Sequence, residues 1–121
     1  MKFAIAVYSP PGPTANTAYQ FVRTALAQGH EIVRLFFFNA GVNNCAHNES
    51  EALCVQWQQL ISNNQIDAIA CSASAARAEL IQAKPDEPLD NNHVHPLFNA
   101  GGIAQLIDAG TQCDRLLSFG G

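Results

Sequence analysis

The sequence predicts an α/β fold, a three-layer α/β/α sandwich around a mainly parallel sheet of five strands. Short, continuously apolar runs alternate with segments in which apolar residues recur every three or four positions. Strands that are apolar on both faces are typical of a parallel sheet covered by helices on each side. The 121 residues suffice for one core, and no repeat or linker divides them. We therefore expect a single domain over residues 1–121.

The expected elements alternate along the whole chain. Strands are expected at residues 2–8, 32–38, 66–70, 95–99 and 116–119. Helices are expected from residue 14 to Gly29, over residues 50–62, from Cys71 to about residue 83, and around residues 103–107 with an end at Gly110. Residues 84–92 hold two prolines among acids and asparagines, which predicts a solvated loop.

Charge and composition exclude several classes of function. The net charge is −4 and only six residues are basic, so a nucleic-acid surface with clustered Lys and Arg is not expected. The first seven residues contain one basic residue and an apolar run that is too short for a signal peptide. No apolar run is long enough to span a bilayer. The four cysteines form no CxxC pair and are expected to be thiols. We expect a cytoplasmic protein without direct contact to nucleic acid or membrane.

Three loops of the predicted sheet carry chemically useful residues. Right-handed crossovers place every strand-to-helix loop at the carboxyl edge of a parallel sheet, where open α/β folds bind their ligands. The loops at residues 9–14 and 39–48 and the turn at Cys71 all fall there. The candidate site is therefore expected at this edge.

Cys71 is the strongest candidate for a reactive group. It follows a strand and begins a helix, so helix amide groups and the positive end of the helix dipole favour the ionised thiolate. The residues behind it are small, which leaves room for a reacting partner. Cys54 lies in the apolar stripe of a helix and Cys113 opens the last strand, so both are expected to be structural. Cys45 lies in a polar stretch, so it is expected to be more open and could be a second thiol, with His47 as its only local activator.

Other patterns are weaker. Cys71 and Arg77 have the C-x5-R spacing of anion cradles, but the intervening residues contain no glycine and favour a helix. Six helical steps of about 100° then turn Arg77 away from Cys71, towards another surface such as a second subunit. His93 and His95 lack further ligands at a recognisable spacing, and the prolines after the first strand remove donors that phosphate would need. We expect no metal and no organic cofactor.

Several segments together resemble a known family. They are residues 1–7 with the proline loop that follows, residues 29–31, the strand end at 36–38 with Gly41-Val42, residues 57–60, the pattern Cys71-x-Ala73-x-Ala75-x-Arg77, and residues 113–119. In this order they resemble the DsrE/TusD-type sulfurtransferase subunits, most closely those of the relay that makes tRNA 2-thiouridine. Where that family tends to have arginine and glycine after the matching arginine, Ala78 and Glu79 stand here.

The resemblance implies a function for Cys71. In the family, the matching cysteine accepts sulfane sulfur as a persulfide and passes it on. The resemblance further implies a DsrE-like five-stranded fold, assembly with two related subunits into a heterohexamer, a small upstream sulfur-donor protein and a downstream acceptor protein. The expected activity is a sulfurtransferase that serves 2-thiolation of the tRNA wobble uridine.

Alternative functions remain open on the sequence. A related carrier in dissimilatory sulfur oxidation, a scaffolding subunit without a catalytic thiol, a C-x5-R phosphatase and a flavodoxin-like electron carrier are the competing hypotheses.

Overall fold

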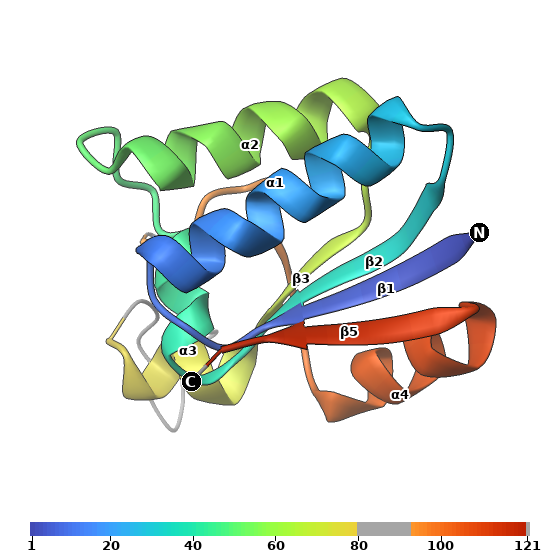
Figure 1. The fold of residues 1–121 in the computed structure, drawn as a ribbon. Helices are drawn as coiled ribbons and strands as arrows, with labels where there is room; N and C mark the ends of the chain where they lie inside the picture. The colour runs from blue at the N-terminus through green and yellow to red at the C-terminus, as the bar shows by residue number, and fades with distance from the viewer. Residues whose placement is uncertain (80–92, 121) are drawn as a thin grey trace.

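The computed structural model describes residues 1–79 and 93–120, which fold as an α/β sandwich (Figure 1). The elements, in chain order, are β1 (Lys2–Val7), α1 (Pro13–Ala27), β2 (Glu31–Phe37), the 3₁₀ helix η1 (Asn39–Cys45), α2 (Ala52–Asn64), β3 (Ala68–Cys71), α3 (Ser72–Arg77), β4 (Asn99–Gly101), α4 (Ile103–Gln112) and β5 (Arg115–Phe119).

The five strands form one sheet in the order β4-β3-β2-β1-β5, and all neighbouring pairs are parallel. Helices α1 and α2 lie over one face, and α3 and α4 lie on the other (Figure 1). The predicted three-layer architecture is therefore confirmed. Because every strand runs in the same direction, the loops that follow the strands share one edge of the sheet.

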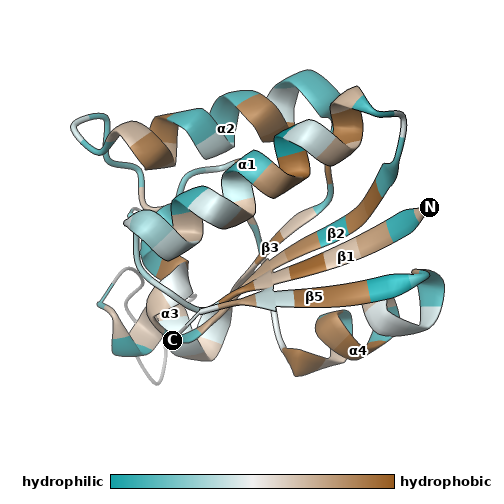
Figure 2. Ribbon diagram, viewed as in Figure 1, coloured by the Kyte–Doolittle hydropathy of each residue, from teal (hydrophilic) through white to brown (hydrophobic). Residues whose placement is uncertain are grey.

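Alternation along the central strands divides the buried residues between the two faces. In β1, Phe3, Ile5 and Val7 join the core under α1 and α2, whereas Ala4 and Ala6 face the opposite layer. Trp57 of α2 is fully buried in that core, and its ring meets the rings of Tyr19 and Phe37 edge to face, at centroid distances of 5.4 and 5.2 Å. The hydropathy colouring shows apolar residues concentrated along these strands and the facing sides of α1 and α2 (Figure 2).

Some predicted boundaries are wrong. The fourth strand is Asn99–Gly101, because residues 95–98 close a turn in which the Phe98 amide donates to the His95 carbonyl at 3.0 Å. Helix α4 continues through Gly110 to Gln112, since Gly110 keeps a helical conformation without a positive φ. Helix α3 ends at Arg77, and Glu79 has a φ of 61°, so the helix expected to reach residue 83 already stops before residues 80–92, which lie outside the described residues. The loop expected at residues 84–92 lies there too.

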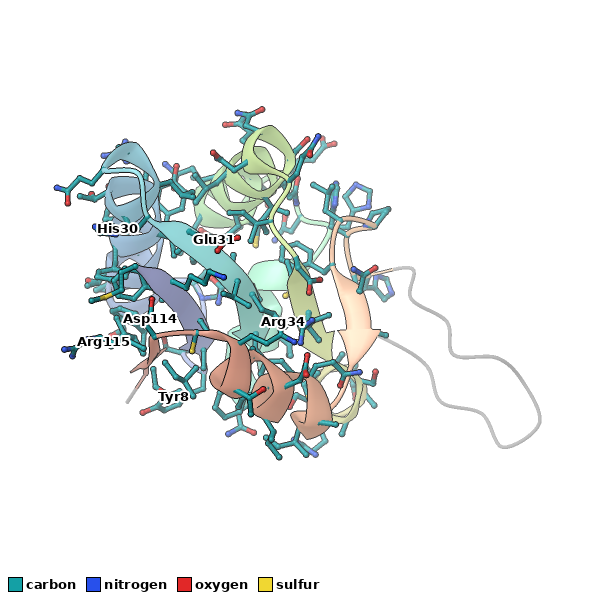
Figure 3. All side chains as sticks on the ribbon, turned by 90° about the vertical axis from the view of Figure 1, so that its right-hand side faces the viewer. Tyr8, His30, Glu31, Arg34, Asp114 and Arg115 are labelled. Carbon is teal, nitrogen blue, oxygen red and sulfur yellow. The ribbon has the colours of Figure 1, made fainter. Side chains whose placement is uncertain are left out.

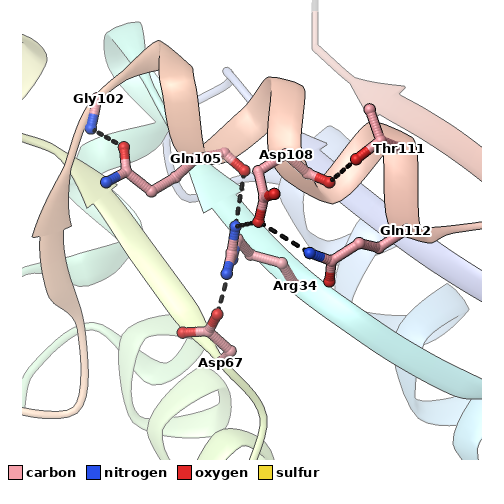
Figure 4. A network of polar contacts seen from close by, with 7 residues as sticks. All are labelled: Arg34, Asp67, Gly102, Gln105, Asp108, Thr111 and Gln112. Carbon is pink, nitrogen blue, oxygen red and sulfur yellow. Dashed lines mark hydrogen bonds and ion pairs between the residues drawn. The ribbon is translucent and has the colours of Figure 1, made fainter.

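One arginine links helix α4 to the sheet through polar contacts (Figure 4). Arg34 of β2 donates to the Asp67 carboxylate at 2.6 Å, to the Gln105 carbonyl at 2.8 Å and to the Asp108 carboxylate at 3.3 Å. The hydrogen bond to Asp67 is the main cause that raises the pKa of Arg34. Arg34 thus ties β2 to the start of β3 and to α4, which is a structural role.

Candidate functional site

The three predicted loops meet at the carboxyl edge of the sheet. The buried Asn44 side chain of η1 donates to the carbonyls of Ser9, at 3.0 Å, and Gly41, at 2.9 Å, and accepts from the Trp57 indole at 3.3 Å. It thereby joins the loop after β1 to η1 and α2. Ser9 is 5% exposed, and its Oγ finds no hydrogen-bond partner among the described residues. Sequence reasoning did not identify Asn44 as the residue that joins these loops.

Cys71 lies where β3 passes into α3. It is the last residue of the strand, opposite Gly101 of β4, and it is the N-cap of the helix, so the thiol belongs to the carboxyl edge as expected. Its side chain is partly exposed and makes no capping hydrogen bond to the first turn. The residue is therefore partly open to a reacting group, and its sulfur is not held by the backbone of α3.

The other thiols differ from Cys71 in burial or in place. Cys45 has no exposed surface, and burial raises the pKa of its thiol well above the usual range, with nearby Cys54 adding to the effect. The expectation that Cys45 is more open is wrong. Cys54 is 1% exposed, and its thiol donates to the Asn43 carbonyl at 3.3 Å. Burial is the main cause that raises the pKa of this thiol to about 11, and the nearby Glu51 adds to the effect. Both residues are poor sources of thiolate at neutral pH.

Cys113 is partly exposed but lies at the opposite edge of the sheet. It is the C-cap of α4, two residues before β5 begins, and its thiol is 3.6 Å from the Gly110 carbonyl. Figure 3 looks onto this amino edge, where His30, Glu31, Asp114 and Arg115 gather. A pocket of about 510 Å³ at the amino edge is lined in part by Lys2 and Glu31, which form an exposed ion pair at 3.8 Å. This pocket is larger than a second one, of about 310 Å³, beside α3. Open α/β sheets, however, bind their ligands at the carboxyl edge.

Arg77 does not simply point away from the site. The backbone from Ser72 to Arg77 is helical, as expected, so no loop of free amides surrounds an anion in the manner of a C-x5-R phosphatase. Helical side chains lean towards the N-terminus of their helix. The Arg77 guanidinium accordingly donates to the Ser74 Oγ at 3.1 Å, and the backbone amide of Asn39 donates to the same oxygen at 2.8 Å.

These residues line a pocket of about 310 Å³ between η1 and α3, together with Ala40 and Ala78. Sequence reasoning missed Ser74 and Asn39, although a serine three residues after a candidate thiol falls on nearly the same side of a helix.

His47 and His95 lie together beneath the end of η1. Their rings are 5.0 Å apart between centroids, the His47 amide donates to the His93 carbonyl at 2.8 Å, and the His95 amide donates to the Cys45 carbonyl at 2.9 Å. Burial is the main cause that lowers the pKa of His95, and the neighbouring His47 lowers it further. Within residues 1–79 and 93–120 no three His, Cys, Asp or Glu side chains form a cluster that could hold a metal ion.

A family model decides the classification, because it matches residues 1–119. The chain belongs to the DsrE/DsrF-like family. It is 39% identical to a protein of Pseudomonas aeruginosa named sulfurtransferase TusD homolog, with 100% of this chain and 98% of the relative covered. It is 33% identical to a putative sulfurtransferase DsrE of Allochromatium vinosum, with 99% of both chains covered.

A solved structure agrees with the family's fold. The crystal structure of the ychN protein from E. coli matches with a TM-score of 0.70 over 98% of this chain and 97% of its own, at 14% sequence identity. None of the helices in the described part of the chain is long and apolar enough to cross a membrane.

Proposed function

We propose that this chain is a sulfurtransferase subunit in which Cys71 accepts sulfane sulfur as a persulfide and relays it to an acceptor protein. The observation that carries the proposal is the placement of the four thiols, all of which are described. Cys45 and Cys54 are buried and Cys113 lies at the amino edge, so Cys71 alone is a partly exposed thiol at the carboxyl edge. The whole-length similarity to two proteins named as sulfurtransferases supports it.

The proposed reaction needs only thiol chemistry. The Cys71 thiolate attacks the outer sulfur of a donor persulfide, a new Sγ–S bond forms, and the donor's own S–S bond breaks. The donor sulfur leaves as a thiolate with the electron pair, and the transferred sulfur keeps its proton on Cys71. An acceptor thiolate then attacks the outer sulfur of the Cys71 persulfide in the same way. No metal or organic cofactor enters either step.

The proposed partners are proteins. They are a small upstream sulfur donor, a downstream acceptor and two related DsrE-family subunits that complete a heterohexamer. The final recipient in this proposal is the wobble uridine of tRNA, in a cytoplasmic relay. Its support is the resemblance to relay subunits and the higher identity to the TusD homolog than to DsrE, 39% against 33%. The net charge of −4 suits a subunit that hands sulfur to a protein and leaves tRNA to a later component.

Loading with sulfur tests the proposal. The purified chain is incubated with a cysteine desulfurase and cysteine, and intact and peptide masses are recorded without reductant. We expect a gain of about 32 Da, one sulfur atom, on the peptide that contains Cys71. The gain should disappear in Cys71→Ser and persist in Cys113→Ser, which removes the other partly exposed thiol.

In cells that lack the endogenous chain, wild type and Cys113→Ser should restore tRNA 2-thiouridine, whereas Cys71→Ser should not. Loading that persists in Cys71→Ser would contradict the role of Cys71. Full tRNA thiolation with Cys71→Ser would favour a scaffolding subunit.

A further inference from the structure

The pocket between η1 and α3 has the chemistry of an anion-binding site. Asn39, Ala40, Ser74, Arg77 and Ala78 line its volume of about 310 Å³. Arg77 supplies a positive charge, two alanines supply small walls, and none of these lining residues is acidic. A volume of this size admits a functional group of a larger molecule rather than a single ion.

Among the described residues, hydrogen bonding in the pocket leaves donors rather than acceptors for a ligand. The buried Ser74 is 3% exposed, and its Oγ accepts from both the Arg77 guanidinium and the Asn39 amide. Its hydroxyl proton enters no hydrogen bond found among the described residues. Arg77 has five N–H groups, and within residues 1–79 and 93–120 one of them is seen to donate, to Ser74. A guanidinium and a hydroxyl together favour a carboxylate or sulfonate group.

The pocket begins about one helical turn after the thiol. Cys71 is the N-cap of α3 and Ser74 follows three residues later, while Ser74 and Ala78 are four residues apart and so share one side of the helix. Arg77 lies farther around, but its side chain bends back to Ser74. A molecule held by an anionic group in the pocket therefore reaches along the helix towards Cys71.

We propose that this pocket binds an oxyanionic group of the incoming sulfur donor and so directs its sulfane sulfur to Cys71. The inference rests on the proposed persulfide function and adds a substrate feature to it. The group is a carboxylate on a persulfide-bearing peptide or protein, or the sulfonate end of a small sulfane compound such as thiosulfate. With thiosulfate, the Sγ–S bond forms as the S–S bond breaks, and sulfite leaves with the electron pair.

Donors with and without an anionic group test the pocket. Rates of Cys71 persulfidation are measured with glutathione persulfide, which has two carboxylates, and with the persulfide of N-acetylcysteine amide, which has none. The ratio of the two rates should fall by about 1.5- to 5-fold in Arg77→Gln, the range expected for a solvent-accessible ion pair. It should fall less in Arg77→Lys, and added salt should reduce the wild-type ratio. Arg23→Gln, which removes an exposed charge on α1, is the matched control and should leave the ratio unchanged.

Thiosulfate as the donor tests whether the anionic group bound by the pocket is a sulfonate or a carboxylate. Persulfidation by thiosulfate that depends on Arg77 indicates a sulfonate donor, whereas dependence with glutathione persulfide alone indicates a carboxylate donor. Binding is also measured without transfer, as saturable shifts of the Asn39 and Ser74 amide resonances in Cys71→Ser titrated with sodium acetate and with thiosulfate. These shifts should be lost in the Cys71→Ser, Arg77→Gln double variant.

The outcomes separate this inference from the proposed function. An unchanged rate ratio in Arg77→Gln, together with no saturable shift, would overturn the anion site while the sulfur-carrier proposal stands. Saturable, Arg77-dependent shifts with no persulfide on Cys71 from any donor would retain the anion site and overturn the sulfur-carrier function.

Discussion

Burial separates four chemically identical side chains into two groups. Cys45 and Cys54 are enclosed, with a pKa well above the usual range for Cys45 and about 11 for Cys54, whereas Cys71 and Cys113 are partly exposed. Since the thiolate is the reactive form, we expect iodoacetamide at pH 8 to label Cys71 and Cys113 in the folded protein. Cys45 and Cys54 should be labelled only after denaturation. Peptide mass spectrometry of samples taken over time checks the order, and early labelling of Cys45 would contradict the observed burial.

The sequence predicted the burial of a residue correctly where the local pattern sets it. It was misleading where contacts with a distant segment set it. Cys54 follows the apolar stripe of its helix and is buried, as predicted. Cys45 lies among polar residues, yet η1 turns it inward and the His95 amide donates to its carbonyl at 2.9 Å. That contact joins segments fifty residues apart, which local composition cannot predict. The Asn39–Ser74 hydrogen bond beside the pocket likewise joins two distant segments, η1 and α3.

Two glycines at the scale of single elements should respond oppositely to the same substitution. Gly110 lies inside α4, and a Cβ there would meet nothing within 4 Å. Gly110→Ala should therefore stabilise the protein by about 0.5–1 kcal/mol, because alanine loses less backbone entropy in a helix. A Cβ at Gly41 would lie 2.0 Å from the Val7 carbonyl oxygen, so Gly41→Ala must push η1 away from the end of β1.

We expect Gly41→Ala to cost about 3 kcal/mol or more, as severe overpacking does. The free energy of unfolding from urea denaturation measures both variants. A destabilised Gly110→Ala would contradict the helical continuation of α4, and a neutral Gly41→Ala would contradict the close contact between η1 and β1.

Element types were predictable because the periodicity of apolar residues is a local property, whereas several element ends were not. The expected helix end at Gly110 relied on the usual role of glycine after a helix, but α4 continues to Gln112 before the chain turns into β5. The fourth strand has only three residues and is defined by pairing with β3, so its position depends on a partner rather than on its own sequence.

At the scale of the whole molecule, the three-layer order could be predicted from strands that are apolar on both faces. The exposure of apolar residues on the last helix could not be predicted. Its apolar residues predicted a helix, yet Ile103 and Ile107 are 62% and 64% exposed, one turn apart on α4. On the neighbouring edge strand β5, Leu116 is 44% exposed. Two exposed isoleucines on adjacent turns of one helix are typical of a surface that another protein covers.

The proposed assembly with related subunits gives these residues a covering partner. A tagged chain expressed in its native host should purify with two further DsrE-family chains, at the mass of a heterohexamer by light scattering. The double substitution Ile103→Gln, Ile107→Gln should reduce that association at least about tenfold, because it removes two apolar side chains from the contact. Ala52→Gln, an exposed change on α2 across the sheet, is the matched control. Both variants should remain folded by circular dichroism, since the altered positions are exposed. An unchanged complex with the double substitution would place the subunit contact elsewhere and leave the exposed face of α4 without this role.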